Sequence, residues 1–158
     1  MKLYATKALY FFAIAFICLS QSGLAFAQHK PAASIPSADL IQPADLAANL
    51  KSAAQKPLVL QVGFRKLYAQ AHIPDSEYVG PANEDAGLQL LRNRVAKLTK
   101  DTAIVIYCGC CPWSHCPNIA AAYDALHALG FTRVKVLYIA ENFGDNWVNL
   151  GYPVVMGR

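Results

Sequence analysis

The chain has 158 residues, of which 55% are hydrophobic and only 15% charged, and its formal net charge is +4. Two of the positive charges, Lys2 and Lys7, lie in an N-terminal segment that we expect to be removed, so the mature chain would carry +2. This small charge, without any run of lysines or arginines, argues against a nucleic-acid-binding protein. The remaining length is typical of one domain, which can bury enough surface to fold without a disulfide scaffold.

The first 27 residues have the pattern of a cleavable secretory signal. A positively charged start precedes an apolar stretch over residues 8–20, and Ala25-Phe26-Ala27 supplies the small residues of a cleavage site. The apolar stretch is shorter than the roughly 20 residues that span a bilayer, which disfavours the alternative of a retained membrane anchor. We therefore predict a signal peptide over residues 1–27 and a periplasmic or secreted protein that leaves the membrane after cleavage.

The rest of the chain alternates helical and strand patterns after a leader. Residues 28–40 are rich in proline, alanine and serine, which predicts a flexible leader before a domain over residues 41–158. Apolar residues three or four positions apart predict helices over residues 43–53, 84–98, 118–129 and 142–150. Short apolar runs predict buried strands over residues 58–62, 102–107 and 134–139. This alternation predicts an α/β fold with a central parallel sheet of about four to five strands, covered on both faces.

Four of the five cysteines lie in one loop between a predicted strand and a predicted helix. The loop runs from Cys108, directly after the strand that ends at Tyr107, to Asn118, which would cap the helix that stops at Gly130. Sites in parallel α/β sheets lie at the carboxyl ends of strands, and a helix N-terminus favours an anion. A cysteine in this place is expected to have a lowered pKa, so Cys108 is the predicted nucleophile.

Three stretches of the chain resemble the rhodanese-like domain family, and together they cover about residues 41–155. They are the turn Ala71-His72-Ile73-Pro74, the strand and cysteine over Ile104–Cys108, and the closing pattern from Ala122 to Val154. The resemblance implies a three-layer rhodanese-like fold and sulfurtransferase chemistry. By this resemblance, Cys108 is the catalytic residue that attacks a donor's sulfane sulfur, holds the sulfur as a persulfide and passes it to a thiol acceptor.

The loop departs from the family's usual form, which is shorter and often ends in arginine. No lysine or arginine lies between Cys108 and Asn118. Gln61 and Gly63 occupy the places where the family's first-strand signature has an acidic residue and an arginine, with Arg65 close behind. A dianionic donor such as thiosulfate would lack its cation here, and burial of an unpaired charge is costly. The sequence therefore favours sulfur donors of lower charge.

The other loop residues allow several roles. If a persulfide or sulfenic acid forms on Cys108, other residues of the loop would support or resolve it. These residues are Cys110, Cys111, His115, Cys116 and Asn118. Alternatively, Cys108 and the other loop thiols would bind zinc or copper(I) together with His115 in a non-enzymatic module. A local disulfide such as Cys111–Cys116 would only stiffen the loop, and a fourth interpretation is an inactive interaction domain.

The expected partners follow from the sulfur-transfer interpretation. They are a small sulfur donor, a thiol acceptor and a redox partner protein, since export places the thiols in an oxidising compartment. We expect no cofactor, because the spacing of the cysteines matches neither a standard zinc finger nor a haem attachment motif.

Overall fold

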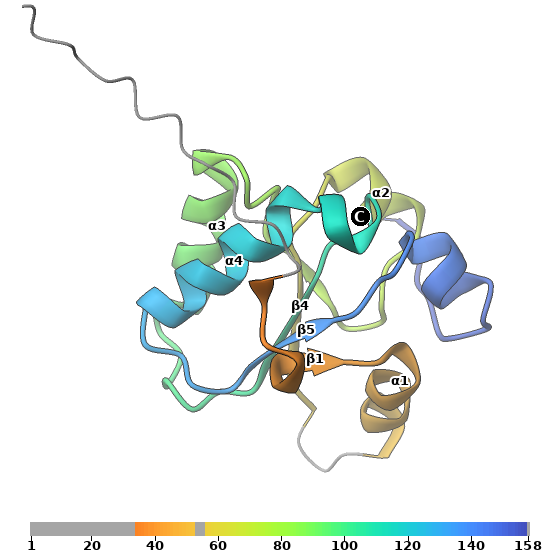
Figure 1. Cartoon of the computed structure of the whole chain (residues 1–158), viewed down its shortest axis with the longest axis horizontal. Coiled ribbons are helices and arrows are strands. Elements are labelled where there is room, and N and C mark those ends of the chain that lie inside the picture. Colours follow the sequence, from red (N-terminus) through yellow and green to blue (C-terminus); the bar gives the residue numbers. More distant parts are fainter. Residues whose placement is uncertain (1–33, 53–55, 158) are drawn as a thin grey trace, which may run out of the picture.

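Five parallel strands form one sheet in the order β1-β5-β4-β2-β3. The computed structural model describes residues 34–52 and 56–157, so the predicted signal peptide lies outside the described residues. The strands are β1 (Leu40–Ile41), β2 (Leu58–Gln61), β3 (Glu77–Tyr78), β4 (Ile104–Tyr107) and β5 (Val134–Leu137). The predicted α/β fold with a parallel sheet of four to five strands is confirmed (Figure 1).

The three central strands are those that the apolar runs predict. All four residues of β4 are buried, and Ile106 lies opposite Leu60 of β2 on one side and Val136 of β5 on the other. Strands covered on both faces need apolar side chains at successive positions, because neither face meets water. β2 and β5 end one and two residues earlier than predicted, and β4 ends at Tyr107 as predicted.

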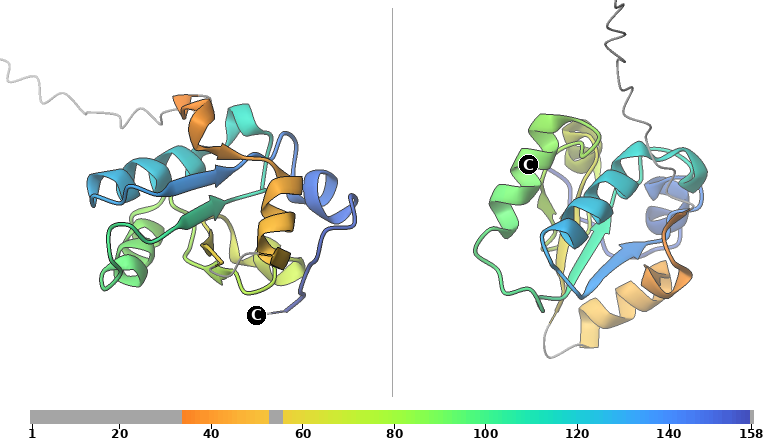
Figure 2. Two further views of the ribbon diagram at one scale, coloured as in Figure 1. Left: turned by 90° about the horizontal axis from the view of Figure 1, so that it is seen from below. Right: turned by 60° about the vertical axis from the view of Figure 1, so that its left-hand side comes forward.

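Helices cover both faces of the sheet (Figures 1 and 2). The helices are α1 (Pro43–Ser52), α2 (Arg65–Gln70), α3 (Asp85–Val95), α4 (Pro117–Ala128) and the π-helix η4 (Gly144–Val148), with short 3-10 turns η2 (Ser37–Asp39) and η3 (Trp113–His115). Four of them, α1, α3, α4 and η4, correspond to the four predicted helices. α1 begins at Pro43 as predicted, α3 and η4 are shorter than predicted, and α4 begins and ends one residue earlier. The predicted stop at Gly130 is also confirmed, since this residue has a φ of 87°.

Alternate residues of the central strands define two cores. Leu60 and Ile106 belong to a cluster with Leu91 of α3 and Leu126 of α4. Their neighbours Val59 and Val105 belong to a second cluster with Leu46 of α1 and Trp147 of η4, on the other face of the sheet. The period of two in a strand thus divides the apolar side chains between the two helical layers.

Short elements at the sheet edges were not predicted. β1 and β3 have two residues each and α2 has six, which is too short for a periodic pattern to develop. The leader prediction for residues 28–40 needs correction in its described part, because Ile35 is buried in the core and Leu40 pairs with Val136 in the sheet. The folded unit therefore begins before residue 41.

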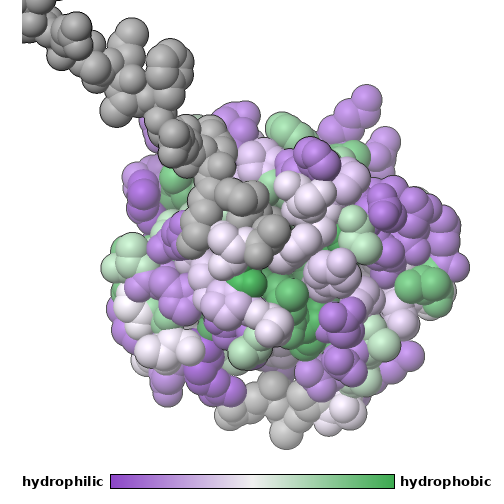
Figure 3. Space-filling view, in the orientation of Figure 1, coloured by the Kyte–Doolittle hydropathy of each residue, from purple (hydrophilic) through white to green (hydrophobic). Residues whose placement is uncertain are grey.

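The described surface is mainly polar on the face shown in Figure 3, with apolar residues in small groups. Among the described residues, no helix has the length and apolar character needed to cross a membrane.

Candidate functional site

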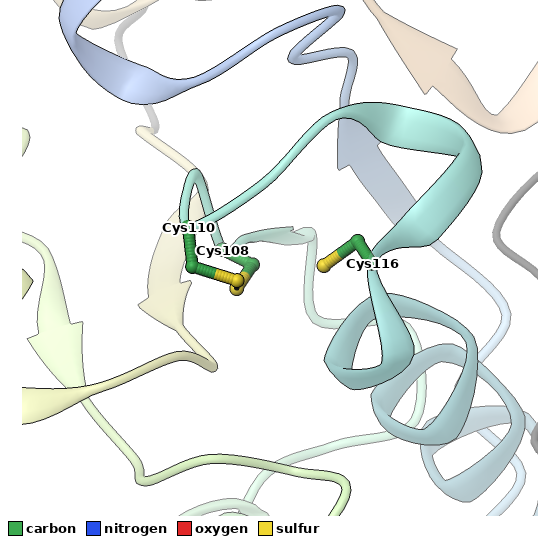
Figure 4. Close-up of side chains that lie close together, drawn as sticks. All are labelled: Cys108, Cys110 and Cys116. Atoms are coloured by element: carbon green, nitrogen blue, oxygen red, sulfur yellow. Dashed lines mark hydrogen bonds between the residues drawn. The ribbon is translucent and has the colours of Figure 1, made fainter.

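Three cysteine sulfurs meet where β4 ends and α4 begins. Cys108 directly follows β4, and the loop turns so that Cys110 lies beside it. Cys116 immediately precedes the first residue of α4. The three Sγ atoms all lie within 4.8 Å of one another. Figure 4 shows the Cys116 side chain pointing from the start of α4 toward the other two. Seven residues lie between Cys108 and Cys116 in the sequence, so the turn of the loop creates the cluster, which we call the thiol trio.

Distances within the loop are short. The Cys108 and Cys110 sulfurs are 3.1 Å apart, and the Cys110 and Cys111 sulfurs are also 3.1 Å apart. Cys111 lies outside the trio and its thiol points to the His115 carbonyl oxygen at 3.7 Å. All four cysteines of the loop are free thiols. The loop therefore holds a chain of sulfur contacts that begins at the buried Cys108.

Asn118 lies in the site rather than at the helix cap. Its side chain is fully buried, and Nδ2 donates to the Cys108 sulfur at 3.4 Å and faces the Cys110 sulfur at 3.9 Å. Its Oδ1 accepts the Asn83 backbone N–H at 3.0 Å. The N-cap prediction for Asn118 is wrong, because Pro117 takes the first helical position and Cys116 becomes the cap. The side-chain amide of Asn118 therefore donates to a thiol of the trio and does not cap the helix.

The last residue of β2, Gln61, and the nearby Gly63 form the floor beneath Cys108. Gln61 is buried, and its Nε2 donates to the Cys108 carbonyl oxygen at 3.3 Å while its Oε1 accepts the Gly63 N–H at 3.1 Å. A Cβ atom on Gly63 would lie 2.8 Å from the Cys108 sulfur. In the sequence, both residues stand out only as departures from the family signature, with no role assigned to them. Their position at the end of a strand beside β4 is the signal that could have found them.

Cys116 has the lowest pKa of the three thiols in the trio. Thiols of Cys108 and Cys110 donate to its sulfur, and with help from the Ile119 N–H in the first turn of α4 they lower the pKa of Cys116 to about 4. The pKa of Cys108 is raised by its hydrogen bonds to Cys110 and Cys116 and by burial. The expectation that the helix terminus lowers the pKa of Cys108 is therefore wrong, since the helix begins at Cys116 instead.

In this arrangement the three thiols lose only one proton readily and share the remaining two. Ionisable groups in contact lose their protons as a coupled set, and a second thiolate beside the first is disfavoured. Cys116 can accept a proton from Cys108, and the negative charge then lies on Cys108. Asn118 is placed to stabilise that charge, because its Nδ2 already donates to the Cys108 sulfur.

A cavity of about 340 Å³ opens beside the trio. Its wall contains Cys108 and Cys110 but not Cys116, so a small molecule in the cavity meets the first two sulfurs. The other lining residues, all uncharged, are Gln61, Leu67, Gln70, Ala71, Tyr107, Gly109, Asn142, Phe143, Gly144 and Val148. Arg65, the nearest arginine to the signature, lies over the Tyr78 ring at 4.2 Å. Within the described residues, the wall therefore offers amide groups and apolar surface to a substrate.

The two remaining loop candidates lie apart from the trio. His115 is exposed, and its Nδ1 is 2.8 Å from the Ser114 hydroxyl. The Trp113 ring lies 5.2 Å from the Tyr138 ring, and the backbone N–H of Trp113 donates to the Ala140 carbonyl oxygen. The structure thus brings together Cys108, Cys110, Cys116 and Asn118, and it leaves Cys111 and His115 at the periphery.

Comparison with solved structures shows a shared fold. The BH2092 protein from Bacillus halodurans is 23% identical, with 74% of this chain and 76% of that chain covered and a TM-score of 0.57. The Alr3790 protein from Anabaena is 19% identical over 73% of this chain and 91% of its own, with a TM-score of 0.57. A rhodanese-like domain protein from Staphylococcus aureus is 14% identical over 76% and 99%, with a TM-score of 0.52.

The family itself is shown by a direct match of the sequence. No curated protein matches the chain. Residues 42–138, more than half of the chain, match the family described as Rhodanese-like domain. This span contains the sheet from β2 to β5 and the whole cysteine loop. The chain belongs to the rhodanese-like domain family.

Proposed function

We propose that this protein transfers sulfane sulfur through a persulfide on Cys108. The observation that supports the proposal most is the position of Cys108, which ends β4, lines the cavity and contacts two other thiols. Membership of the rhodanese-like family favours sulfurtransferase-type chemistry. The trio supplies what such chemistry needs, namely a nucleophilic sulfur, an acceptor for its proton and a hydrogen-bond donor for its charge.

The proposed reaction has two steps that conserve atoms and electrons. The Cys108 thiol gives its proton to Cys116, and the Cys108 thiolate attacks the outer sulfur of a donor R–S–SH. The S–S bond of the donor breaks, Cys108 holds the persulfide, and the donor leaves as the thiolate R–S⁻. An acceptor thiolate then attacks the outer sulfur of this persulfide, takes it as its own persulfide and restores the Cys108 thiolate.

The donor class follows from the cavity. Its described lining residues carry no charge, so a doubly charged donor would lose water there without gaining a cation. A persulfide or polysulfide of low charge loses less hydration, and Gln61, Gln70 and Asn142 offer amide groups to its polar end. We therefore propose small persulfides as donors and thiols as acceptors.

Intact-mass spectrometry tests the proposal directly. The reduced, metal-free protein is mixed with glutathione persulfide, and its thiols are analysed after rapid quenching with an alkylating reagent. The expected result is sulfur from the donor on Cys108, seen either as a persulfide or as its immediate product, and its loss in Cys108→Ser. Absence of any reaction between the donor and the wild-type protein would refute the proposal.

Binding of a soft metal ion is a second candidate function, and the trio is the observation that favours it. Among the described residues, the group of side chains that could hold a metal comprises Cys108, Cys110 and Cys116, without Cys111 or His115. Structural zinc sites use four ligands, whereas thiolates select copper(I) among soft ions. We therefore expect one copper(I) per chain if this function holds, measured by competition with a copper(I) chelator and lost in Cys116→Ser.

Export is part of the proposed function. The charged start, apolar stretch and small-residue site of residues 1–27 support secretion or transfer to the periplasm. In that compartment the trio would depend on a redox partner to stay reduced. N-terminal sequencing of the exported protein is expected to begin at Gln28, and recovery of the uncleaved chain in the membrane fraction would contradict export as a free protein.

A further inference from the structure

The surroundings of Cys108 decide which thiol reacts with a persulfide that forms on it. Cys108 is 3% exposed and Cys116 is 4% exposed, so both sulfurs are shielded from bulk water, and Cys108 is reached through the cavity whose wall it lines. Two other sulfurs of the same chain already lie within 4.8 Å of Cys108. Any persulfide on Cys108 thus forms beside thiols that are held in place. An intramolecular reaction between oriented groups has a large advantage over attack by a thiol from solution.

Cys108 borders two separate spaces, and Cys116 lines only the smaller of them. Cys108 and Cys110 line the cavity of about 340 Å³, and Cys116 does not. Cys108 and Cys116 instead share a second, much smaller space with Trp113, Ile119 and Ile139 beneath the loop. The outer sulfur of a persulfide would therefore occupy the cavity while Cys116 approaches from the α4 side. Displacement at sulfur needs this arrangement, in which the attacking atom lies opposite the leaving atom.

We propose that Cys116 reduces the Cys108 persulfide, so that the protein releases sulfide and forms a Cys108–Cys116 disulfide. This inference rests on the proposed function, because it needs sulfur on Cys108 first. The donor thiolate that left takes the proton that Cys116 received during loading, which restores the Cys116 thiolate. This thiolate attacks Cys108 Sγ, a new S–S bond forms between the two cysteines, and the bond to the outer sulfur breaks. The outer sulfur takes the electron pair and leaves as HS⁻. The sulfane sulfur is thereby reduced and the two cysteine sulfurs are oxidised.

A dithiol partner closes the cycle. The two electrons that reduce the sulfur come from Cys108 and Cys116, so a second turnover needs a dithiol that reduces their disulfide and becomes a disulfide itself. The net reaction converts a persulfide and a dithiol into a thiol, sulfide and a disulfide. On this route the partner is a thiol reductant protein, whereas the direct transfer of the proposed function uses an acceptor thiol that carries the sulfur away.

Cys116 is better suited than Cys110 to this role. Cys110 is closer to Cys108, with 3.1 Å between their sulfurs, but it shares the cavity wall with Cys108 and so lies on the side of the leaving sulfur. Only Gly109 separates the two cysteines in sequence, and its φ of 72° already holds a tight turn. Cys116 approaches from another element, and it also carries the charge of the trio.

A single-turnover experiment tests the inference with one equivalent of glutathione persulfide and the reduced, metal-free protein. For the wild-type protein we expect one equivalent of released sulfide, a mass lower by two hydrogens, and a Cys108–Cys116 disulfide in the peptide map. Cys116→Ser lacks the proton acceptor of the loading step and loads more slowly, so its reaction is followed to completion; we then expect no released sulfide and a protein mass that is higher by one sulfur atom. Serine is a favoured N-cap residue, so this variant keeps the start of α4, which its circular dichroism spectrum checks.

Two further variants separate the possible failures. Cys111→Ser removes a loop thiol that lies outside the trio, and we expect it to release sulfide as the wild type does. Cys110→Ser decides between the two candidate resolving thiols: retention of the persulfide in Cys110→Ser, with sulfide release in Cys116→Ser, would overturn the assignment to Cys116. A wild-type protein that keeps its persulfide and releases no sulfide would overturn the inference and leave the proposed function intact. Failure of every variant to react would overturn the proposed function.

Discussion

The side-chain nitrogen of Asn118 lies 3.4 Å from the Cys108 sulfur and donates a hydrogen bond to it. The other end of the same amide accepts the Asn83 N–H, which fixes the orientation of the group. Asn118 is fully buried, so water cannot replace the donor if it is removed. A hydrogen bond to a charged group contributes more than one between neutral groups, and the bond therefore strengthens when Cys108 becomes a thiolate.

Replacement of Asn118 by aspartate isolates this contact. Asn118→Asp keeps an oxygen for the Asn83 N–H but loses the donor to sulfur and adds a negative charge beside it. We expect persulfide formation on Cys108 to slow by at least roughly tenfold, which corresponds to about 1.4 kcal/mol of lost stabilisation. Stopped-flow rates with glutathione persulfide measure the effect. Asn118→Ala, which loses both contacts, is expected to lower the melting temperature more, and an unchanged rate in both variants would refute the role.

Gly63 is predicted to tolerate no side chain. In Gly63→Ala the added Cβ would lie 2.8 Å from the Cys108 sulfur and 2.9 Å from Gln61 Nε2, so the floor of the site must shift. Overpacking of a buried site typically costs about 1–3 kcal/mol. We expect a loss of this size in urea unfolding together with a large loss of sulfur loading in protein that is still folded. Normal loading by the folded variant would show that Cys108 does not need its present position.

The reactivity of the trio is predicted to persist at acidic pH. The pKa of Cys116 is lowered to about 4, so the trio holds a thiolate at pH 6, where an ordinary thiol with a pKa of ~8.5 is almost fully protonated. The rate of alkylation by iodoacetamide should therefore change little from pH 8 to pH 5 and fall below that range. In Cys116→Ser we expect a drop of more than tenfold at pH 6. A wild-type rate that rises about tenfold per unit between pH 6 and pH 8 would contradict this charge distribution.

Donor preference is predicted to follow the charge of the cavity wall. Thiosulfate should be a poor donor compared with glutathione persulfide, because the described lining residues carry no charge. Gln70 is exposed and lines the cavity, so Gln70→Lys adds a cation without disturbing the core. We expect Gln70→Lys to raise kcat/KM for thiosulfate severalfold and Gln70→Glu, the matched control, to lower it. Thiosulfate as the best donor of the wild-type protein would refute the argument.

The sequence predicts the centre of this fold better than its edges, for a physical reason. β2, β4 and β5 are covered on both faces, so each appears as a continuous apolar run. β1 and β3 contribute two residues each, and their pairing depends on neighbours far away in the sequence. Tertiary contacts decide such elements, and a local pattern cannot show them.

The site was predictable in its location but not in its charge distribution. The concentration of cysteines after a buried strand indicated the loop correctly, and the structure places Cys108, Cys110 and Cys116 together. Two features depend on the path of the loop instead. Pro117 shifts the helix cap to Cys116, which moves the thiolate away from Cys108, and it frees Asn118 to contact sulfur. Gln61 and Gly63 come from another strand and meet the loop only in three dimensions.

The enlarged loop is attached by its backbone to the segment that follows β5. The Gly109 carbonyl oxygen accepts the Phe143 N–H at 3.1 Å, and the Ala140 carbonyl oxygen accepts the Trp113 N–H at 2.9 Å. Gly109 also leaves no room for a side chain, since a Cβ atom there would lie 2.6 Å from the Phe143 Cβ. The smallest transplantable unit of this site is therefore two segments, residues 108–118 and 140–143. A chimera that received only the first segment in another rhodanese-like domain would lack both anchors and could not hold the thiols at their present spacing.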